Sequence, residues 1–190
     1  MKDLSACPVC EHSSFHHSYA HQERSTGKLW NVVVCNSCHL GFINPQPNWE
    51  ELSSYYAVTY SPYQASRHEL EEYEQIKEQA RISGELRFAP IKDGTRLLDV
   101  GCGGGTFLKL ASELGALVQG VEPSAYATQI ATEQGFKVFN GTMPQFVETF
   151  HHHQFDVITA NHVLEHTPDP VATLLSIKQV LAPDGVAVIS

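Results

Sequence analysis

The chain has 190 residues, 42% of them hydrophobic, and a formal net charge of −9 from 12 basic and 21 acidic residues. This length suits one well-packed domain with a small appendage, and no apolar stretch is long enough to cross a bilayer or to act as a signal sequence, so we expect a cytoplasmic protein without a membrane partner. The acidic excess and the lack of a Lys/Arg cluster argue against a nucleic-acid partner, because phosphates are bound by clustered basic side chains.

Residues 1–47 are rich in Cys, His and Ser, and they are too few and too polar to build a core without a staple. They contain two C-x-x-C pairs, Cys7/Cys10 and Cys35/Cys38, and a single short strand is predicted at WNVVVC. Two such pairs direct four thiolates at one tetrahedral ion, and a closed four-thiolate site holds a structural zinc ion. We therefore predict a small zinc-ribbon-like module. Nearby histidines are alternative ligands, although solvated positions are favoured for each: His12, His16, His17 and His39.

Residues 48–94 are predicted to form a connector followed by a helix from about Ala65 to Phe88, ended by Pro90 and Gly94. The connector is dense in tyrosine, namely Tyr55, Tyr56, Tyr60 and Tyr63. These rings could cover a site as a lid, but packing of the connector against the core is favoured.

From residue 95 to residue 190, short apolar strands alternate with amphipathic helices. We expect strands at 96–100, 116–122, 136–141, 155–161 and 185–190, and helices at 106–115, 124–135, 143–150 and 170–181. This alternation predicts an α/β fold with a Rossmann-like, doubly wound, mostly parallel sheet and right-handed crossovers. Because the chain stops within an apolar fifth strand, which would leave a raw sheet edge, we expect the domain to be truncated there and incomplete at its C-terminus.

The segment LLDVGCGGG, residues 97–105, is a strand that runs into a glycine turn before a helix, as in nucleotide-binding folds. The dinucleotide pattern G-x-G-x-x-G would require glycine at Thr106. Asp99 would repel a pyrophosphate, but it suits the ammonium and sulfonium charges of S-adenosylmethionine (SAM). Glu122 ends the next strand, where a carboxylate can accept hydrogen bonds from both ribose hydroxyls. Cys102 is expected to be a small buried side chain without a nucleophilic role.

Four segments, LLDVGCGGG, GVEPS, FDVITANHVLEHTPDP and LAPDGVAVIS, together resemble class I SAM-dependent methyltransferases in order and spacing. The resemblance covers residues 97–190 and implies methyl transfer from SAM to a small polar acceptor. It implies that the turn and the ends of the second to fourth strands bind SAM through Asp99, Gly101, Cys102, Gly103, Gly105, Glu122, Pro123, Thr142, Met143 and Asn161. By this likeness, Glu122 would hold the ribose, and Thr142 and Met143 would flank the adenine.

His162, Glu165 and His166 follow the fourth strand at positions i, i+3 and i+4, so a helical turn would place them on one side. We predict that this trio is catalytic, with a histidine as general base near neutral pH. The competing interpretation, which is favoured for Glu165 and His166, is that they only hold the turn. The stretch also resembles ubiquinone-pathway O-methyltransferases, whose E-x-x-E-H binds a metal ion. His162 at the first position makes magnesium less suited here.

The cysteine quartet before this core resembles deoxysugar C-methyltransferases and related bacterial enzymes, which implies a sugar or sugar nucleotide as the acceptor. Two other functions stay open from the sequence. An RNA methyltransferase would bind nucleic acid with the zinc module, but the negative net charge of the chain argues against this function. A non-catalytic SAM-binding module would hold the donor without transferring its methyl group.

Overall fold

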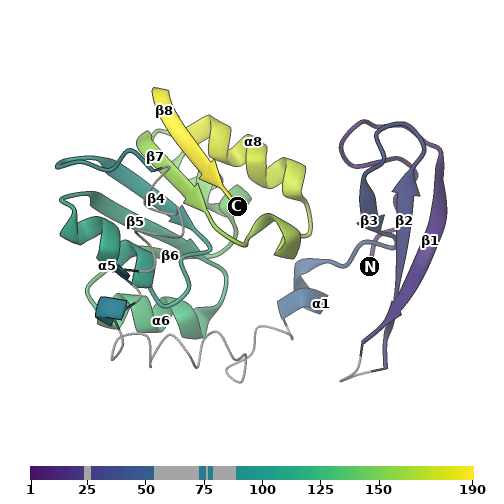
Figure 1. Cartoon of the computed structure of the whole chain (residues 1–190), viewed down its shortest axis with the longest axis horizontal. Helices are drawn as coiled ribbons and strands as arrows, with labels where there is room; N and C mark the ends of the chain where they lie inside the picture. The colour runs from purple at the N-terminus through teal and green to yellow at the C-terminus, as the bar shows by residue number, and fades with distance from the viewer. Residues whose placement is uncertain (24–26, 54–72, 76, 79–88) are drawn as a thin grey trace. The chain divides into compact units, whose positions relative to one another are not determined.

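The computed structural model of the protein describes residues 1–23, 27–53, 73–75, 77–78 and 89–190. The chain divides into two compact units, residues 1–54 and 55–190 (Figure 1). The four connector tyrosines and most of the helix predicted from Ala65 to Phe88 lie outside the described residues, although 73–75 and 77–78 are helical. Across the described ranges, no helix has the length and apolar character needed to span a bilayer.

The first unit is built on a small antiparallel sheet with the order β1-β2-β3. Its elements are β1 (Phe15–Gln22), β2 (Leu29–Cys35), β3 (Gly41–Ile43) and the short helix α1 (Trp49–Ser53). In β2, Trp30, Val33 and Cys35 are buried, which gives the unit only a small core. β1 is exposed at every position except Phe15, which is half-buried. Residues 15–22 therefore form a strand because they pair with β2. Their polar sequence did not predict this strand.

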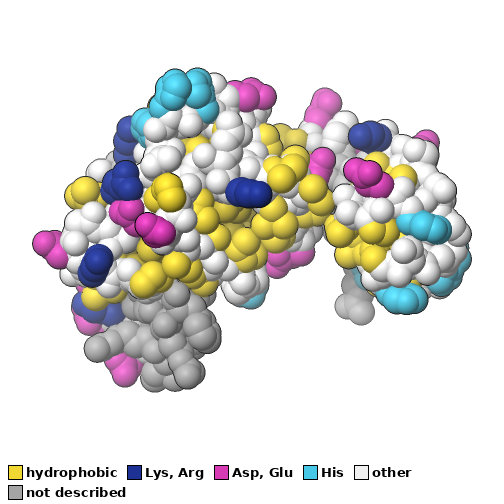
Figure 2. Space-filling view, turned by 90° about the horizontal axis from the view of Figure 1, so that it is seen from above, with side chains coloured by type: hydrophobic (Ala, Val, Ile, Leu, Met, Phe, Trp, Pro, Cys, Tyr) yellow, Lys and Arg dark blue, Asp and Glu magenta, His cyan; other side chains and the backbone are white. Residues whose placement is uncertain are grey.

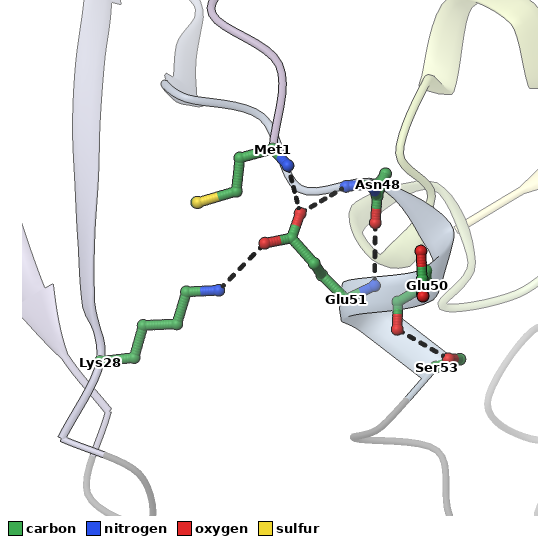
Figure 3. A network of polar contacts seen from close by, with 6 residues as sticks. All are labelled: Met1, Lys28, Asn48, Glu50, Glu51 and Ser53. Atoms are coloured by element: carbon green, nitrogen blue, oxygen red, sulfur yellow. Dashed lines mark hydrogen bonds and ion pairs between the residues drawn. The ribbon is translucent and has the colours of Figure 1, made fainter.

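A polar network closes the end of the first unit around α1 (Figure 3). The Glu51 carboxylate accepts a hydrogen bond from the Asn48 backbone N–H at 3.2 Å, and the Glu51 N–H donates to Asn48 Oδ1 at 2.9 Å. The same carboxylate pairs with the Met1 amino group at 2.7 Å and with Lys28 Nζ at 3.5 Å. The hydrogen bond from the terminal amine is the main cause that lowers the pKa of Glu51. Glu51 thus caps α1 and ties it to the start of the chain and to the β1–β2 hairpin.

The second unit contains a parallel sheet of five described strands in the order β6-β5-β4-β7-β8. The strands are β4 (Arg96–Val100), β5 (Leu117–Glu122), β6 (Val138–Asn140), β7 (Phe155–Ala160) and β8 (Leu181–Ile189). The helices are α5 (Thr106–Glu113), α6 (Ala125–Glu133), α7 (Met143–Phe150) and α8 (Pro170–Val180). The predicted Rossmann-like α/β fold with a mostly parallel sheet is confirmed.

Helices cover both faces of this sheet, so its central strands are buried on both sides (Figure 1). One core cluster joins the sheet to α7 and α8 and includes Leu98, Phe146 and Ile177. Leu97 and Ala111 belong to a second cluster, which joins the sheet to α5. Burial on both faces is typical of parallel sheets with crossover helices, and it explains the nearly continuous apolar run of β4.

The last strand begins earlier than its sequence predicts. Leu181 pairs with Phe155, and after a register shift Val186 pairs with Val157, so residues 182–185 form an irregular bulge. A Cβ atom at Gly185 would lie 2.9 Å from Leu181 Cδ1 and 3.0 Å from two backbone oxygens, so the bulge requires glycine there. The strand predicted at 185–190 is the regular second part of β8. The bulge before it was not predicted, because a pattern of apolar residues does not show where a strand shifts its register.

Candidate active site

The strand order of the second unit reverses between β4 and β7. From β4 the chain moves outward through β5 to β6, and it then returns to the other side of β4 for β7 and β8. In open α/β sheets, ligands bind at such a switch point, outside the carboxyl ends of the strands. Both predicted acids, Asp99 near the end of β4 and Glu122 at the end of β5, lie at this edge.

Asp99 is buried beside the switch point, with 4% of its surface exposed. It lies opposite Gly120 of β5 and Thr159 of β7, and Thr159 Oγ1 donates a hydrogen bond to Asp99 Oδ1 at 2.7 Å. A buried carboxylate is costly to place unless it is hydrogen-bonded or meets a positive charge. Burial, helped by the charges of Asp99 and Glu122, raises the pKa of the Cys102 thiol well above its ordinary value. This edge of the sheet therefore favours a cationic ligand.

The glycine turn between β4 and α5 has backbone that only glycine adopts easily. Gly101 has a φ of +71° and Gly103 a φ of +53°. A Cβ atom at Gly101 would lie 2.5 Å from Val163 Cγ2, so this glycine lets the turn pack against the segment that follows β7. No atom lies within 4 Å of a Cβ position at Gly103. The turn is thus packed on one side and open at Gly103, as a ligand cradle requires.

Glu122 is also buried, with 3% of its surface exposed, and its two oxygens have different partners. The Gly103 N–H donates to Oε2 at 3.0 Å, and the Ser124 N–H donates to Oε1 at 2.8 Å. The carboxylate that we predict to bind the ribose therefore also fixes the glycine turn. Pro123 lies between Glu122 and Ser124, the N-cap of α6.

Asn140, at the end of β6, supports this segment and was not predicted from the sequence. Its Nδ2 donates to the Glu122 carbonyl at 3.0 Å and to the Pro123 carbonyl at 3.3 Å. The sequence signal that could have identified it is its position near the end of the strand predicted at 136–141. Asn140 holds the backbone at the turn between β5 and α6.

The two residues predicted to flank the adenine begin α7. The Thr142 N–H and hydroxyl both donate to Gln145 Oε1, at 2.8 and 3.0 Å, which caps the helix. Met143 has only 2% of its surface exposed and packs in the core with Phe146. Both follow Asn140 at the carboxyl edge of the sheet, and their contact with adenine stays a prediction.

The predicted catalytic trio lies directly after β7. Glu165 Oε1 is 3.7 Å from His162 Nδ1 and 3.9 Å from His166 Nε2, so one carboxylate serves both imidazoles. Leu164–His166 forms a 3-10 turn, which groups the side chains in place of the predicted α-helical turn. His162 has a φ of +52° and a side chain that is 79% exposed. A positive φ at a residue other than glycine is uncommon and costs conformational energy, and residues strained in this way cluster at functional sites.

The end of β8 holds the residues before this turn. The His162 N–H donates to the Ser190 carbonyl at 2.9 Å, and the Ser190 hydroxyl donates to Asn161 Oδ1 at 3.1 Å. Asn161, which is predicted to bind SAM, is thus positioned from the outer strand. Ser190 was not predicted, because the pairing spans 29 residues of sequence.

Within the described part of the chain, the four cysteines are the only His, Cys, Asp or Glu group whose ligand atoms converge. The four sulfurs lie within 4.8 Å of one another, with Cys7 and Cys35 buried and Cys10 and Cys38 exposed. The trio after β7, which lies within the described ranges, does not form such a group. Among the candidate histidine ligands, His12 Nδ1 accepts from the Ser14 N–H, and His16 Nδ1 is hydrogen-bonded to Asn36 Oδ1.

The two C-x-x-C segments have the same backbone geometry. The Cys7 N–H donates to the carbonyl of His12 at 2.9 Å, and the Cys35 N–H donates to the carbonyl of Leu40 at 3.0 Å. In each segment the residue after the second cysteine, Glu11 or His39, has a φ of +60°. Backbone N–H groups of Cys38 and Ser37 lower the pKa of Cys35 to about 6, although burial opposes them. Although the Leu40 backbone N–H lowers the pKa of Cys38, the Cys10 thiol and burial raise this pKa to about 12. Since a thiolate is the form that binds metal, ionisation of all four thiols calls for a cation among them.

A separate groove of about 730 Å³ lies at the opposite, amino-end edge of the sheet. Its lining includes Arg96, Gln119 and Lys137, and Arg96 is paired with Asp156 at 2.5 Å. Neither predicted acid nor any residue of the glycine turn lines it. The groove is therefore distinct from the predicted donor site at the carboxyl edge.

The floor of the glycine turn gives a first testable prediction. A Cβ atom at Gly120 would lie 2.5 Å from Cys102 Sγ and 3.1 Å from Leu108 Cδ1, so Gly120→Ala overpacks this buried contact. We expect the free energy of unfolding to fall by about 1–3 kcal/mol, as measured by urea denaturation followed by circular dichroism. Adding Cys102→Ala should recover part of the loss, because it removes the sulfur. Gly41→Ala is the control, since no atom lies within 4 Å of its Cβ position.

Together the parallel sheet, the glycine turn and the acids at two strand ends have the arrangement of Rossmann-like nucleotide-binding folds. Residues 68–190 match the family model described as a methyltransferase domain. The match covers more than half of the chain, and the chain belongs to this methyltransferase family.

Among curated proteins, the chain is 40% identical over 102 residues to the ubiquinone biosynthesis O-methyltransferase of Actinobacillus pleuropneumoniae. The aligned region covers 49% of this chain and 44% of that protein. It is 38% identical over 106 residues to the enzyme of the same name from Haemophilus ducreyi, and this alignment covers 51% of this chain and 45% of that protein. The chain thus spans less than half the length of these relatives.

Solved structures show the same fold. A SAM-dependent methyltransferase from Archaeoglobus fulgidus superposes with a TM-score of 0.52 at 24% identity, over 62% of this chain and 52% of that one. The plantazolicin methyltransferase in complex with S-adenosylhomocysteine (SAH) superposes with a TM-score of 0.54 at 19% identity, over 73% of this chain and 55% of that one. At these identities the likeness establishes the architecture of the sheet and its helices.

Proposed function

We propose that the protein is a SAM-dependent methyltransferase that transfers the methyl group to an oxygen atom of a small-molecule acceptor. The observation that carries the proposal is the pair of buried carboxylates, Asp99 and Glu122, beside a glycine turn that is open at Gly103. A cationic donor with a ribose suits this arrangement, because one acid offers negative charge and the other offers acceptors for hydroxyl groups.

Oxygen as the acceptor atom is supported by the curated relatives, which are named O-methyltransferases. Their names refer to ubiquinone biosynthesis and give no particular support to a sugar. We therefore propose a hydroxyl-bearing small molecule as the acceptor class, in which a sugar hydroxyl is one member. Deprotonation of such a hydroxyl calls for a base close to the transferred methyl group.

His162 is the residue that we assign to this proton transfer. Bound SAM supplies an electrophilic methyl group, which the acceptor oxygen takes as the carbon–sulfur bond breaks. The His162 imidazole accepts the hydroxyl proton, and Glu165, 3.7 Å away, stabilises the imidazolium that forms. Its Nδ1 faces Glu165, which leaves Nε2 to meet the acceptor. His166 shares the same carboxylate and positions it.

An RNA acceptor has less support from the surface of the protein. Figure 2 shows that Lys and Arg side chains of the described residues are dispersed on this face and mixed with Asp and Glu. Phosphate backbones are bound by basic patches or stripes, which this face does not present. The small-molecule acceptor is therefore the better match.

We further propose that Cys7, Cys10, Cys35 and Cys38 hold a structural zinc ion. Four convergent sulfurs with no open position suit tetrahedral zinc, and the repeated backbone geometry of the two segments directs all four inward. The ion would replace the large core that the first unit lacks, and it would take no part in the methyl transfer.

The role of His162 is tested with His162→Gly and His162→Asn, which both tolerate a positive φ and remove the base. We expect kcat to fall by roughly 100-fold or more, while SAM affinity changes less than about twofold. Transfer of labelled methyl from SAM to a panel of phenols and sugar nucleotides measures kcat, and added imidazole should partly restore the Gly variant.

His151→Asn is the matched control, because His151 lies in the exposed turn after α7, and its rate should equal that of the wild type. An unchanged kcat in both His162 variants would remove the base assignment. Saturable SAM binding without transfer to any acceptor of the panel would instead favour a non-catalytic binding module.

A further inference from the structure

Three hydrogen bonds hold two peptide groups of the glycine turn, the one between Cys102 and Gly103 and the one between Gly104 and Gly105. The Gly105 N–H donates to the Cys102 carbonyl at 3.0 Å, within the turn itself. The Gly103 N–H donates to Glu122 Oε2 at 3.0 Å. The Gly104 carbonyl accepts a hydrogen bond from Gln134 Nε2 at 2.6 Å, which is the shortest of the three. A side chain 30 residues away thus fixes the middle of the turn.

Gln134 is well placed for this contact. It is the C-cap residue of α6, it is half-buried, and its amide also reaches the Ile130 carbonyl at 3.4 Å. The same end of α6 packs against the turn, since a Cβ atom at Gly105 would lie 3.1 Å from both Ala131 Cβ and Phe136 Cδ2. The end of α6 is therefore a rigid support for the turn.

Residues 103–105 are consecutive glycines, so their peptide groups can rotate with little steric resistance. The Gly104 carbonyl and the Gly105 N–H belong to one peptide group, and rotation of this group would turn the Gly104 oxygen from Gln134 toward the ligand side. The methionine part of SAM ends in a carboxylate, which an N–H attracts and a carbonyl oxygen repels. The bond from Gln134 to the carbonyl and the bond from the Gly105 N–H to Cys102 together hold the opposite orientation.

The turn also offers a donor for that carboxylate. Among the described residues, the Gly104 N–H has no hydrogen-bond partner, and Gly103 beside it faces open space. The turn leads into α5, whose N-cap is Gly105 and which has no side-chain cap. Free N–H groups at such a place bind carboxylates well.

We propose that Gln134 is a positioning residue for the methyl donor: it helps to hold the Gly104 carbonyl away from the ligand, so that no carbonyl oxygen opposes the carboxylate of the methionine moiety where that carboxylate meets the Gly104 N–H. The proposal rests on the proposed function, because it assumes that SAM occupies this turn. Gln134 does not touch the reacting atoms, and its effect is confined to ligands that carry the carboxylate.

The test compares two ligands that share adenosine but differ in the amino-acid part. SAH carries the carboxylate, and 5′-methylthioadenosine lacks it. In Gln134→Met and in the isosteric Gln134→Glu, which cannot donate to the Gly104 carbonyl when ionised, calorimetry should show a roughly tenfold loss of SAH affinity. The affinity for 5′-methylthioadenosine should change less than about twofold.

Gln129→Met is the matched control, because Gln129 lies on the same helix and its amide bonds Glu133 Oε1 at 2.8 Å. It should leave both affinities unchanged, and thermal unfolding checks that each variant is folded. Equal weakening of both ligands would show a merely structural role, and no weakening would show no role; either result overturns the proposal. A wild-type protein that binds neither ligand would overturn the proposed function itself.

Discussion

Replacing Cys35 with serine is expected to abolish zinc binding and to unfold the first unit while the parallel sheet stays folded. Cys35 is fully buried at the end of β2, and the apolar core around it includes little more than Trp30 and Val33. Structural zinc contributes about 10–16 kcal/mol of apparent binding free energy in small domains, far more than this core supplies. Bound zinc should fall from near one ion per chain to near zero.

The two units can be followed separately in this experiment. Both tryptophans, Trp30 and Trp49, lie in the first unit, so tryptophan fluorescence reports its unfolding. Circular dichroism at 222 nm follows mainly the helices of the second unit. Cys102→Ser is the control, because it makes the same change outside the cluster and should keep the zinc. Zinc retained by the Cys35 variant, or a metal-free wild type with unchanged fluorescence, would contradict the prediction.

Asp99→Asn is expected to weaken SAM binding by about 10- to 100-fold, the loss typical of a buried hydrogen bond to a charged group. The substitution keeps the size of the side chain and an oxygen that can accept from Thr159, but it removes the negative charge that we assign to the ammonium group of SAM. Glu122→Gln should weaken binding as well, because it disturbs both the ribose contact and the bond to Gly103. Isothermal calorimetry with SAM measures both effects.

Asp156→Asn is the matched control for these variants. Asp156 is an acid of the neighbouring strand β7, but it lies at the opposite edge of the sheet, where it pairs with Arg96. Its loss should leave SAM affinity unchanged. If Asp99→Asn and Glu122→Gln bind SAM as tightly as the wild type, the donor does not occupy this site.

The sequence predicts the second unit closely because its central strands are buried on both faces and its helices have clear ends. β4 and α7 have the predicted bounds, and β5 and α8 differ by one residue at one end. Asp99 and Glu122 could be identified as site residues because parallel strands place their carboxyl ends at one edge.

Other features depend on contacts that leave no local pattern. β1 is a strand although seven of its eight residues are exposed, since β2 supplies its hydrogen bonds. Gln134 and Asn140 support the site through bonds that span 30 and 18 residues of sequence. The left-handed backbone of His162 depends on packing of the turn after β7, and a histidine at this position does not by itself predict a positive φ.

The residues predicted to form the site come from two stretches of the chain. Most of those predicted to bind the donor lie between Asp99 and Met143, whereas Asn161 and His162 follow β7 and are held by the end of β8. Substitutions of the exposed His162 are therefore expected to alter which hydroxyl compound is accepted with little effect on the affinity for SAM. We expect a scaffold of this kind to acquire new acceptors readily, because most of the residues that we assign to SAM recognition lie in another stretch of the chain.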